Sequence, residues 1–341
     1  MSSLPNSYLV LIFFSATVFA QTLRIQPSPT TENLRGISTP SHNVAWASGT
    51  HGTYLRTVDG GSTWQAAQVP GAEALDFRDV EAFNADVAYL LAVGPGDQSR
   101  IYKTTNGGKT WSLQFTNKEP QGFFDCMAFW DREHGIAVGD PVNGKFELIS
   151  TNNGGATWKP LSSSALPPAI DGEGAFAASG TCIAVQGKKN VWFATGGKVA
   201  RVFRSSDAGK TWEVAETPIV HGPDSAGIFS IAFRDARHGV ISGGDYKRPN
   251  DDLPGLAFTE DGGRTWKEAA VSPQSYFSAV AYRAQQILVA GTAHFASMND
   301  PASKTWQKIR NLNLNALAVS PDGSAIAVGP KGMIALLAPV N

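Results

Sequence analysis

The sequence predicts an all-β fold, a seven-bladed β-propeller of four-stranded blades, and three observations carry that prediction. One octapeptide pattern recurs, and its copies end in tryptophans at positions 64, 111, 158, 212, 266 and 306. The resulting spacings of 47, 47, 54, 54 and 40 residues match the length of a four-stranded blade. Charged residues make up only 17% of the 341-residue chain, which also contains 35 glycines and 20 prolines. This composition suits a turn-rich, well-buried β protein.

The net charge of −1 comes without any lysine or arginine block, which argues against nucleic-acid binding.

The first element along the chain is an apolar run, residues 8–19, that ends at Ala20. Val18 and Ala20 fit the small-residue positions of a secretory cleavage site, so we expect a signal peptide over residues 1–20. The run is too short to span a ~30 Å hydrocarbon layer as a helix, which argues against an uncleaved anchor. A buried strand is the alternative. After cleavage we expect a secreted or periplasmic monomer that does not span a membrane.

The octapeptide has the form Thr-x-Asp/Asn-Gly-Gly-x-Thr-Trp, with small variations between copies. The side-chain oxygen of its Asp or Asn can accept hydrogen bonds from backbone N–H groups within a turn, and its glycine can adopt a positive φ. Its tryptophan is expected to pack back on its own blade. We therefore expect a structural role and not a ligand or metal site. The positions concerned are Asp59, Trp64, Asn106, Trp111, Asn153, Trp158, Asp207, Trp212, Asp261 and Trp266, and a worn sixth copy ends at Trp306.

Ahead of each octapeptide runs an apolar strand that ends in glycine. Seven such glycines occur, at Gly49, Gly94, Gly139, Gly196, Gly243, Gly291 and Gly329. The seventh blade stops after residues 333–337 without an octapeptide of its own, whereas residues 22–26 form an unassigned strand before the first blade. We expect this N-terminal strand to complete the last blade, because ring closure removes a free sheet edge. Residues 21–341 then form one domain of seven blades, in preference to six or eight.

The octapeptides lie between the third and fourth strands of each blade and mark the lower face of the ring. A ligand site is expected on the upper face, at the mouth of the central channel. Three upper-face connections from neighbouring blades are unusually long, namely 159–181, 213–229 and 245–254, and long loops on a rigid scaffold often carry function. The alternative is that they are tolerated insertions. They contribute the candidate binding residues Asp171, Glu173, His221, Asp224, Asp245, Tyr246, Lys247 and Arg248.

Alignment of the seven inner strands gives a second set of candidates, which we call the channel-mouth ring. Its members are Arg35, Arg78, Asp125, Thr181, Phe229, Ser278 and Asn315. Two arginines from adjacent blades beside one aspartate could hold a carboxylate or an acidic partner surface. The alternative is a mutual Arg78–Asp125 ion pair that ties two blades together. The next aligned position holds both cysteines, Cys126 and Cys182, so either a disulfide between adjacent blades or two buried thiols is possible.

No nucleophile elbow, zinc-protease motif or phosphate loop occurs in the sequence, and no cofactor or metal site is expected. The octapeptide resembles the Asp-box, or bacterial neuraminidase repeat, and glycoside hydrolases of the sialidase type carry it. A carboxylate pair such as Asp125 with Glu173 or Asp245 could hydrolyse a glycosidic bond, so a glycoside hydrolase or a glycan-binding propeller remains the alternative function.

Over the whole mature chain the sequence is similar to the photosystem II stability/assembly factor family and its bacterial relatives. The resemblance rests on the Gly-Gly-x-Thr-Trp blades, the export signal and the early strand starts Leu34–Arg35 and Phe77–Arg78. It implies a non-catalytic scaffold whose arginine-bearing face holds a partner protein during assembly. In this chain the equivalent positions after the second blade are acidic or neutral. We therefore expect a binding scaffold for a protein or glycan ligand in the cell envelope.

Overall fold

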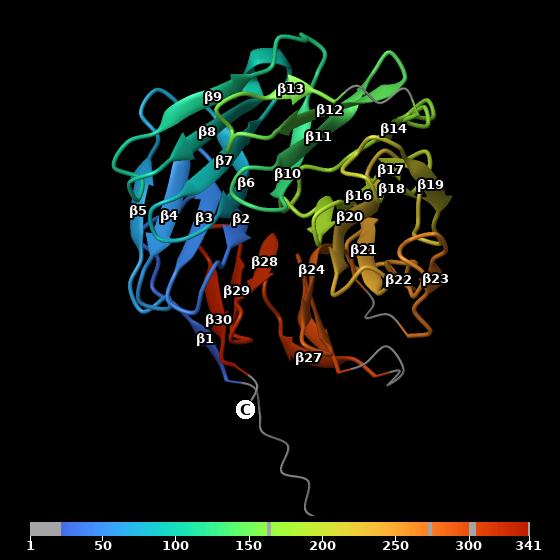
Figure 1. Cartoon of the computed structure of the whole chain (residues 1–341). Coiled ribbons are helices and arrows are strands. Elements are labelled where there is room, and N and C mark those ends of the chain that lie inside the picture. Colours follow the sequence, from blue (N-terminus) through green and yellow to red (C-terminus); the bar gives the residue numbers. More distant parts are fainter. Residues whose placement is uncertain (1–21, 162–164, 272–274, 300–304, 340–341) are drawn as a thin grey trace, which may run out of the picture.

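The computed structural model describes residues 22–161, 165–271, 275–299 and 305–339. In these residues the chain forms β-strands and one short 3₁₀ helix, η1 (Gly96–Gln98). Seven sheets surround a central channel, with one strand of each at the centre and one at the rim (Figure 1). The predicted seven-bladed propeller is confirmed. The predicted signal peptide lies outside the described residues, as does the start of the worn sixth octapeptide.

The blades follow one another along the chain, each running from the channel outward. Blade 1 contains β2 (Leu34–Ser38), β3 (Ala45–Gly49), β4 (Thr53–Thr57) and β5 (Gln65–Gln68). Blade 2 contains β6 (Asp76–Ala82), β7 (Ala88–Val93), β8 (Arg100–Thr104) and β9 (Ser112–Thr116). Blade 3 contains β10 (Phe124–Phe129), β11 (Gly135–Val142), β12 (Lys145–Thr151) and β13 (Lys159–Pro160). Blade 4 contains β15 (Ile183–Gln186), β16 (Asn190–Ala194), β18 (Arg201–Ser205) and β19 (Glu213–Glu216).

The remaining blades complete the ring. Blade 5 contains β20 (Ala226–Phe233), β21 (Gly239–Asp245), β22 (Leu256–Thr259) and β23 (Lys267–Glu268). Two short strands, β14 (Glu173–Gly174) and β17 (Gly196–Gly197), extend its inner edge. Blade 6 contains β24 (Phe277–Arg283), β25 (Gln286–Gly291), β26 (Phe295–Met298) and β27 (Gln307–Arg310). Blade 7 contains β28 (Ala316–Val319), β29 (Ala325–Val328), β30 (Ile334–Leu337) and β1 (Leu23–Ile25).

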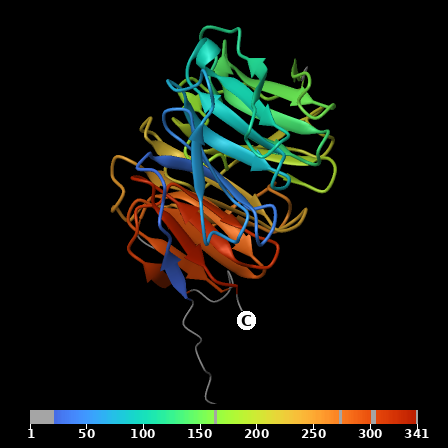
Figure 2. The same cartoon turned by 90° about the vertical axis from the view of Figure 1, so that its left-hand side faces the viewer.

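The N-terminal strand closes the ring as predicted. β1 pairs antiparallel with β30, with Leu23 opposite Leu337 and Ile25 opposite Ala335. Figure 2 shows the blue β1 beside the red strands of the last blade. The closure gives the last blade its fourth strand and covers an edge that would otherwise present unpaired N–H and C=O groups.

The octapeptides form hydrogen-bonded turns of one design. In the first copy Asp59 Oδ1 accepts the Thr63 N–H at 2.9 Å, and the Thr57 hydroxyl oxygen accepts the Gly61 N–H at 3.0 Å. The hydrogen bonds from Thr63 and Thr57 lower the pKa of Asp59 to about 2. The Gly60 N–H donates to the carbonyl of Asn43, in the turn between the first two strands of the same blade. Both kinds of turn therefore lie on one face of the ring.

Trp158, Trp212 and Trp266 pack edge-on against phenylalanines of their own blades, as expected, and Trp111 also reaches the neighbouring blade. Trp111 of blade 2 packs edge-on against Trp46 and Tyr54 of blade 1, at centroid distances of 6.1 and 5.0 Å. The Tyr54 hydroxyl donates to the Gly108 carbonyl inside the blade 2 turn at 2.8 Å. Both faces of a blade are covered by its neighbours, so a large ring at the end of the turn fills the seam between two sheets. The octapeptides thus connect successive blades.

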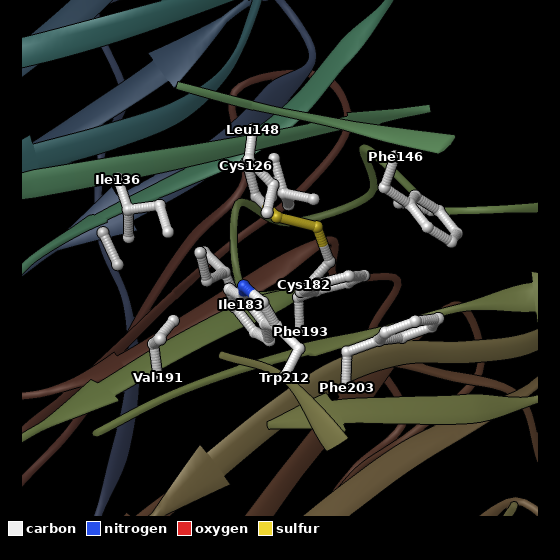
Figure 3. Packing of buried hydrophobic residues seen from close by; sticks show 13 residues of the cluster. Cys126, Ile136, Phe146, Leu148, Cys182, Ile183, Val191, Phe193, Phe203 and Trp212 are labelled. Carbon is white, nitrogen blue, oxygen red and sulfur yellow. A yellow bond between two sulfur atoms is a disulfide. The ribbon is translucent and has the colours of Figure 1, made fainter. Parts of the chain in front are cut away.

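Cys126 and Cys182 form a disulfide between blades 3 and 4, with their Cα atoms 6.0 Å apart. It is embedded in the apolar cluster between the two blades, where it lies close to Leu148, Ile183 and Phe193 (Figure 3). A covalent link at this seam ties together the blades that carry the longest upper-face connection.

The inner strand of blade 2 contains a buried acid, Asp79, and a half-buried one, Glu81, and their ionisation makes stability depend on pH. Burial raises the pKa of Asp79 to about 7, and burial together with the charge of Asp79 raises that of Glu81 well above its usual value. Asp79 Oδ2 accepts the Met127 N–H of blade 3 at 2.7 Å. Since the folded state holds these protons more tightly than the unfolded state, the stabilising effect is complete below about pH 4. It is lost as the pH rises through about 7.

We expect Asp79→Asn, which keeps the acceptor for Met127, to raise the free energy of unfolding at pH 8 by roughly 2 to 4 kcal/mol. The gain should shrink toward pH 5, and denaturant unfolding at several pH values would measure it. Asp86→Asn, at an exposed turn of the same blade, serves as the control. Parallel pH profiles for Asp79→Asn and the wild type would contradict the prediction.

Candidate functional site

The channel-mouth ring owes its position to β-bulges. In blades 1, 2, 3, 5 and 6 the register between the first two strands skips one residue, as between Leu34 and Gly36 or between Phe124 and Cys126. The skipped residues are Arg35, Arg78, Asp125, Phe229 and Ser278, all of them members of the ring. A bulge re-aims the side chain of its extra residue. The inner strands therefore present these five side chains at the mouth of the channel.

A cavity of about 550 Å³, the central cavity, opens at this mouth. Six of the seven ring residues line it, namely Arg35, Arg78, Asp125, Phe229, Ser278 and Asn315. Thr181 does not line it, and its hydroxyl instead hydrogen-bonds those of Ser179 and Ser230. The other lining residues are Phe123, Asp140, Ala175, Phe176, Ala177, Ala178, Tyr246, Tyr276 and Thr292. The volume falls in the range of ordinary ligand sites.

One side of the central cavity is cationic. Arg78 Nε donates to Asp76 Oδ2 at 2.8 Å, and its Nη1 donates to the Ala177 carbonyl at 3.1 Å. Arg78 therefore forms its ion pair with Asp76, and not with Asp125 as in the alternative considered from the sequence. Arg35 Nε is buried and has no hydrogen-bond partner among the described residues. Burial, with the nearby charge of Arg78, lowers the pKa of Arg35, although a guanidinium stays protonated. This side of the cavity can accept an anion.

The side formed by blade 3 is acidic. Asp125 is 1% exposed, and its Oδ2 has no partner among the described residues. Burial and the proximity of Asp140 raise the pKa of Asp125 well above its usual value. Burial also raises the pKa of Asp140 to about 6, although its Oδ1 accepts the Ala175 N–H at 2.9 Å. The raised pKa favours the protonated form of Asp125, in which the carboxyl can donate a hydrogen bond to a ligand.

Aromatic rings form a third part of the wall. Phe176 and Phe229 stack with centroids 4.0 Å apart, and Tyr276 meets Phe229 edge-on at 4.8 Å. Tyr246 stands at the rim, 46% exposed, with its ring 6.2 Å from that of Phe229. Phe176 comes from the long connection before blade 4, so this connection supplies part of the central site.

A second hollow of about 710 Å³, the loop pocket, adjoins the central cavity. Asp140, Ala175 and Phe176 line both. The other lining residues of the loop pocket are Gln121, Pro141, Gly144, Ala169, Ile170, Asp171, Gly172, Glu173, Gly174, Gly196, Gly197 and Asp224. Three of the residues predicted from the long connections, Asp171, Glu173 and Asp224, therefore lie in one pocket.

Two predicted carboxylates are occupied within the protein. Glu173 Oε1 accepts hydrogen bonds from the Thr195 hydroxyl at 2.6 Å and from Arg201 Nε at 2.9 Å. Its Oε2 accepts from Arg201 Nη2 at 2.5 Å and from the Ile170 N–H at 2.9 Å. Asp245 is buried and accepts from Arg248 Nε and the Lys247 N–H. Both support their loops, because a buried carboxylate must be compensated from within the protein.

The remaining candidates lie outside both pockets. His221 makes a contact of 2.9 Å between its Nδ1 and the Ile219 carbonyl. Lys247 and Arg248 are exposed on the connection between the second and third strands of blade 5, and Arg248 also pairs with Asp251 at 3.6 Å. These residues can meet a partner only beyond the cavity mouth.

No family model matches this sequence. The photosystem II assembly protein Ycf48 of a Synechococcus strain is 26% identical, in an alignment that covers 60% of this chain and 80% of that protein. A solved structure described as Ycf48 bound to a D1 peptide has a TM-score of 0.63 at 18% identity, covering 94% of this chain and 97% of that one. The chain is therefore similar in sequence to a photosystem II assembly protein and shares the propeller fold of Ycf48 structures.

Other solved structures extend the likeness of fold. Ycf48 from Cyanidioschyzon merolae has a TM-score of 0.62 at 20% identity and covers 94% of this chain and 99% of its own. A streptogramin B lyase structure has a TM-score of 0.69 at 14% identity, covering 93% and 97% of the two chains. At these identities the likeness concerns the propeller alone. Among the described residues, no helix is long and apolar enough to cross a membrane.

Several residues of the central site were missed by the sequence analysis, although the repeats contain a signal for them. Asp140 and Thr292 each directly follow the recurring glycine that ends the second strand of a blade. Asp76 and Tyr276 each stand two positions before a ring residue. Extending the alignment of the repeats by these two positions would have found all four residues. Phe176 lies in a connection that has no counterpart in the other blades, so no alignment of repeats indicates it.

Proposed function

We propose that this chain is an exported, non-catalytic scaffold that binds a protein partner through its upper face, in the manner of an assembly factor. The observation that carries the proposal is the buried Nε of Arg35 in the central cavity, which has no hydrogen-bond partner in the described part of the chain and lies near the guanidinium of Arg78. The similarity to Ycf48, together with a fold shared with a Ycf48 structure described as bound to a D1 peptide, supports a peptide-like ligand.

In this proposal a carboxylate of the partner enters the central cavity and accepts hydrogen bonds from Arg35 and Arg78. Two positive charges that lie close together and are partly removed from water repel each other, so a bound anion stabilises both. Hydrogen bonds between guanidinium and carboxylate groups are among the strong ones. Phe229, Tyr246 and Tyr276 provide apolar surface for the side chain next to the carboxylate. Binding and orientation are the whole of the function, and no bond in the partner is broken.

The test uses an array of synthetic peptides with free C-terminal carboxylates and their C-terminal amides, with affinities of the hits measured by calorimetry. Arg35→Gln and Arg78→Gln are each expected to weaken binding about 10- to 100-fold, the range for losing a charge-assisted hydrogen bond. Arg237→Gln, on the lower-face turn of blade 5, is the control and should bind as the wild type does. Equal affinity of both variants and the wild type for every peptide would overturn the proposal.

The same variants discriminate the alternatives. A glycan panel that binds the wild type and loses binding in Arg35→Gln would replace the protein partner by a carbohydrate. Hydrolysis of a glycoside that disappears in Asp125→Asn would make the protein an enzyme.

Export is tested separately by N-terminal sequencing of the mature protein from a secreting host, where we expect Gln21 as the first residue. Retention of residues 1–20 would contradict export by this signal.

A further inference from the structure

We propose that the central cavity and the loop pocket form one groove with charged ends of opposite sign, which binds an extended peptide with a carboxylate at one end and a lysine or arginine several residues before it. This inference rests on the proposed function and adds a second recognition element to it. The carboxylate lies at Arg35 and Arg78, and the basic side chain lies over Asp140, Asp171 and Asp224.

The two hollows are continuous, because Asp140, Ala175 and Phe176 belong to the walls of both. Together they lead from the channel mouth outward across blade 3 and the connection before blade 4. Volumes of about 550 and 710 Å³ give room for more than one residue of a ligand. A chain entering at the cationic end can therefore continue toward the loops without leaving the groove.

The outer end of the groove is acidic. Four carboxyl groups line the loop pocket, and the described residues of its wall include no lysine, arginine or histidine. Arg201 balances Glu173, so Asp140, Asp171 and Asp224 provide the charge that a ligand meets. Asp171 and Asp224 are exposed, so a ligand can reach their carboxylates. Lys198 packs beside Gly172 and stays outside the wall, so it weakens the acidic field without cancelling it.

An independent observation favours a ligand in the part of the groove between its two charged ends. Asp125 is 1% exposed, and its Oδ2 has no hydrogen-bond partner among the described residues. An uncompensated buried polar atom costs roughly 1–3 kcal/mol, so such atoms are rare unless a ligand or a water satisfies them. Thr292 Oγ1, which lines the same cavity, also has no hydrogen-bond partner among the described residues. A peptide backbone that passes between the arginines and the loop pocket brings both donors and acceptors to these atoms.

The floor of the loop pocket is built from glycines, which suits a peptide backbone. Gly172, Gly174, Gly196 and Gly197 line it, and β14 pairs with β17 there. A Cβ at Gly174 would lie 2.8 Å from Asp140 Oδ1, and one at Gly197 would lie 2.2 Å from the Gly172 carbonyl oxygen. A side chain at Gly174 would therefore displace Asp140, and one at Gly197 would clash with the backbone that β14 brings beside β17. Glycine at these positions allows main chains to approach each other closely and keeps side chains out of the floor.

The probe is a set of acetylated peptides of small neutral residues that end in leucine with a free carboxylate and carry one lysine at each successive position before it. A matched set carries glutamine in place of lysine. At the best position the lysine peptide should bind about three- to tenfold more tightly than its glutamine partner, the range for a partly exposed ion pair reinforced by neighbouring carboxylates. In Asp171→Asn/Asp224→Asn this preference should disappear, while C-terminal amidation should weaken binding to this variant and to the wild type equally.

Arg35→Gln should show the converse, losing the preference for the carboxylate and keeping that for lysine. Asp97→Asn, in η1 of blade 2, is a control that removes a carboxylate outside both pockets, and thermal unfolding verifies that each variant is folded. If the carboxylate preference is present but no lysine position is preferred, the groove proposal is overturned and the proposed function stands. Failure of every peptide to bind the wild type overturns both.

Discussion

Glu173→Ala is expected to lower the free energy of unfolding by about 3 to 5 kcal/mol, the cost of leaving one partner of a buried ion pair alone. The Glu173 side chain is fully buried and that of Arg201 is only 10% exposed, so water cannot take over the lost contacts. The change removes three hydrogen bonds that fasten Glu173 to Thr195 and Arg201 of blade 4, and a fourth from the Ile170 N–H within the loop. Denaturant unfolding at pH 7 measures the loss.

The same substitution should weaken binding of the carboxylate peptides, although Glu173 does not touch the arginines. Ala177, four residues further on, accepts the hydrogen bond from Arg78 Nη1, so loosening this segment releases one of the two guanidinium groups. Glu173→Leu/Arg201→Met is the matched control, because replacing both charges by apolar groups of similar size is often nearly neutral. A double variant as unstable as Glu173→Ala would mean that packing, and not the stranded charge, determines the loss.

Removal of the disulfide is the second large effect that we expect. Cys126→Ala/Cys182→Ala should lower the free energy of unfolding by about 4 kcal/mol, since the bond closes a loop with a sequence separation of 56 residues in the unfolded chain. For a chain of this length the loss corresponds to a fall in Tm of roughly 6 °C. Calorimetry of the wild type and the variant, with the wild type also measured under reducing conditions, gives the comparison.

Reduced wild type and the double variant should unfold at nearly the same temperature, because both lack the same link and differ only by two sulfur atoms. An unchanged Tm in both would contradict a stabilising role. In that case the link between blades 3 and 4 would be supplied by the apolar cluster around Phe193 and Phe203 alone.

The ring could be predicted from the sequence because each blade repeats the same local chemistry. The threonine, acid, glycine and tryptophan of the octapeptide determine a turn within eight residues, so no distant contact is needed to recognise it. The pairing of β1 with β30 followed from counting strands. The packing of Trp111 against the neighbouring blade was less accessible, because Trp111 meets Tyr54 across a seam between two repeats.

The candidate site was predicted only in part, and the division has a physical reason. Arg35, Arg78 and Asp125 occupy aligned positions, and the bulges then turn them into the cavity. Glu173 and Asp245 lie in loops that have no counterpart in the other blades. The repeat pattern therefore gives no sign that Arg201 pairs with Glu173 or that Arg248 pairs with Asp245. Alignment within a chain finds what the repeats share, whereas ion pairs between unrelated loops depend on three-dimensional packing.

The pairing of β1 with β30 also determines when the molecule can be completed. Residues 23–25 are synthesised about 310 residues before their partners at 335–337. At about 5–20 residues per second, the interval between the two is roughly 15 to 60 s. Until then the growing chain is an open arc with an unfinished blade at one end. Residues 335–337 allow the ring to close, so a chain that lacks them would leave β1 without its partner however well the other six blades had formed.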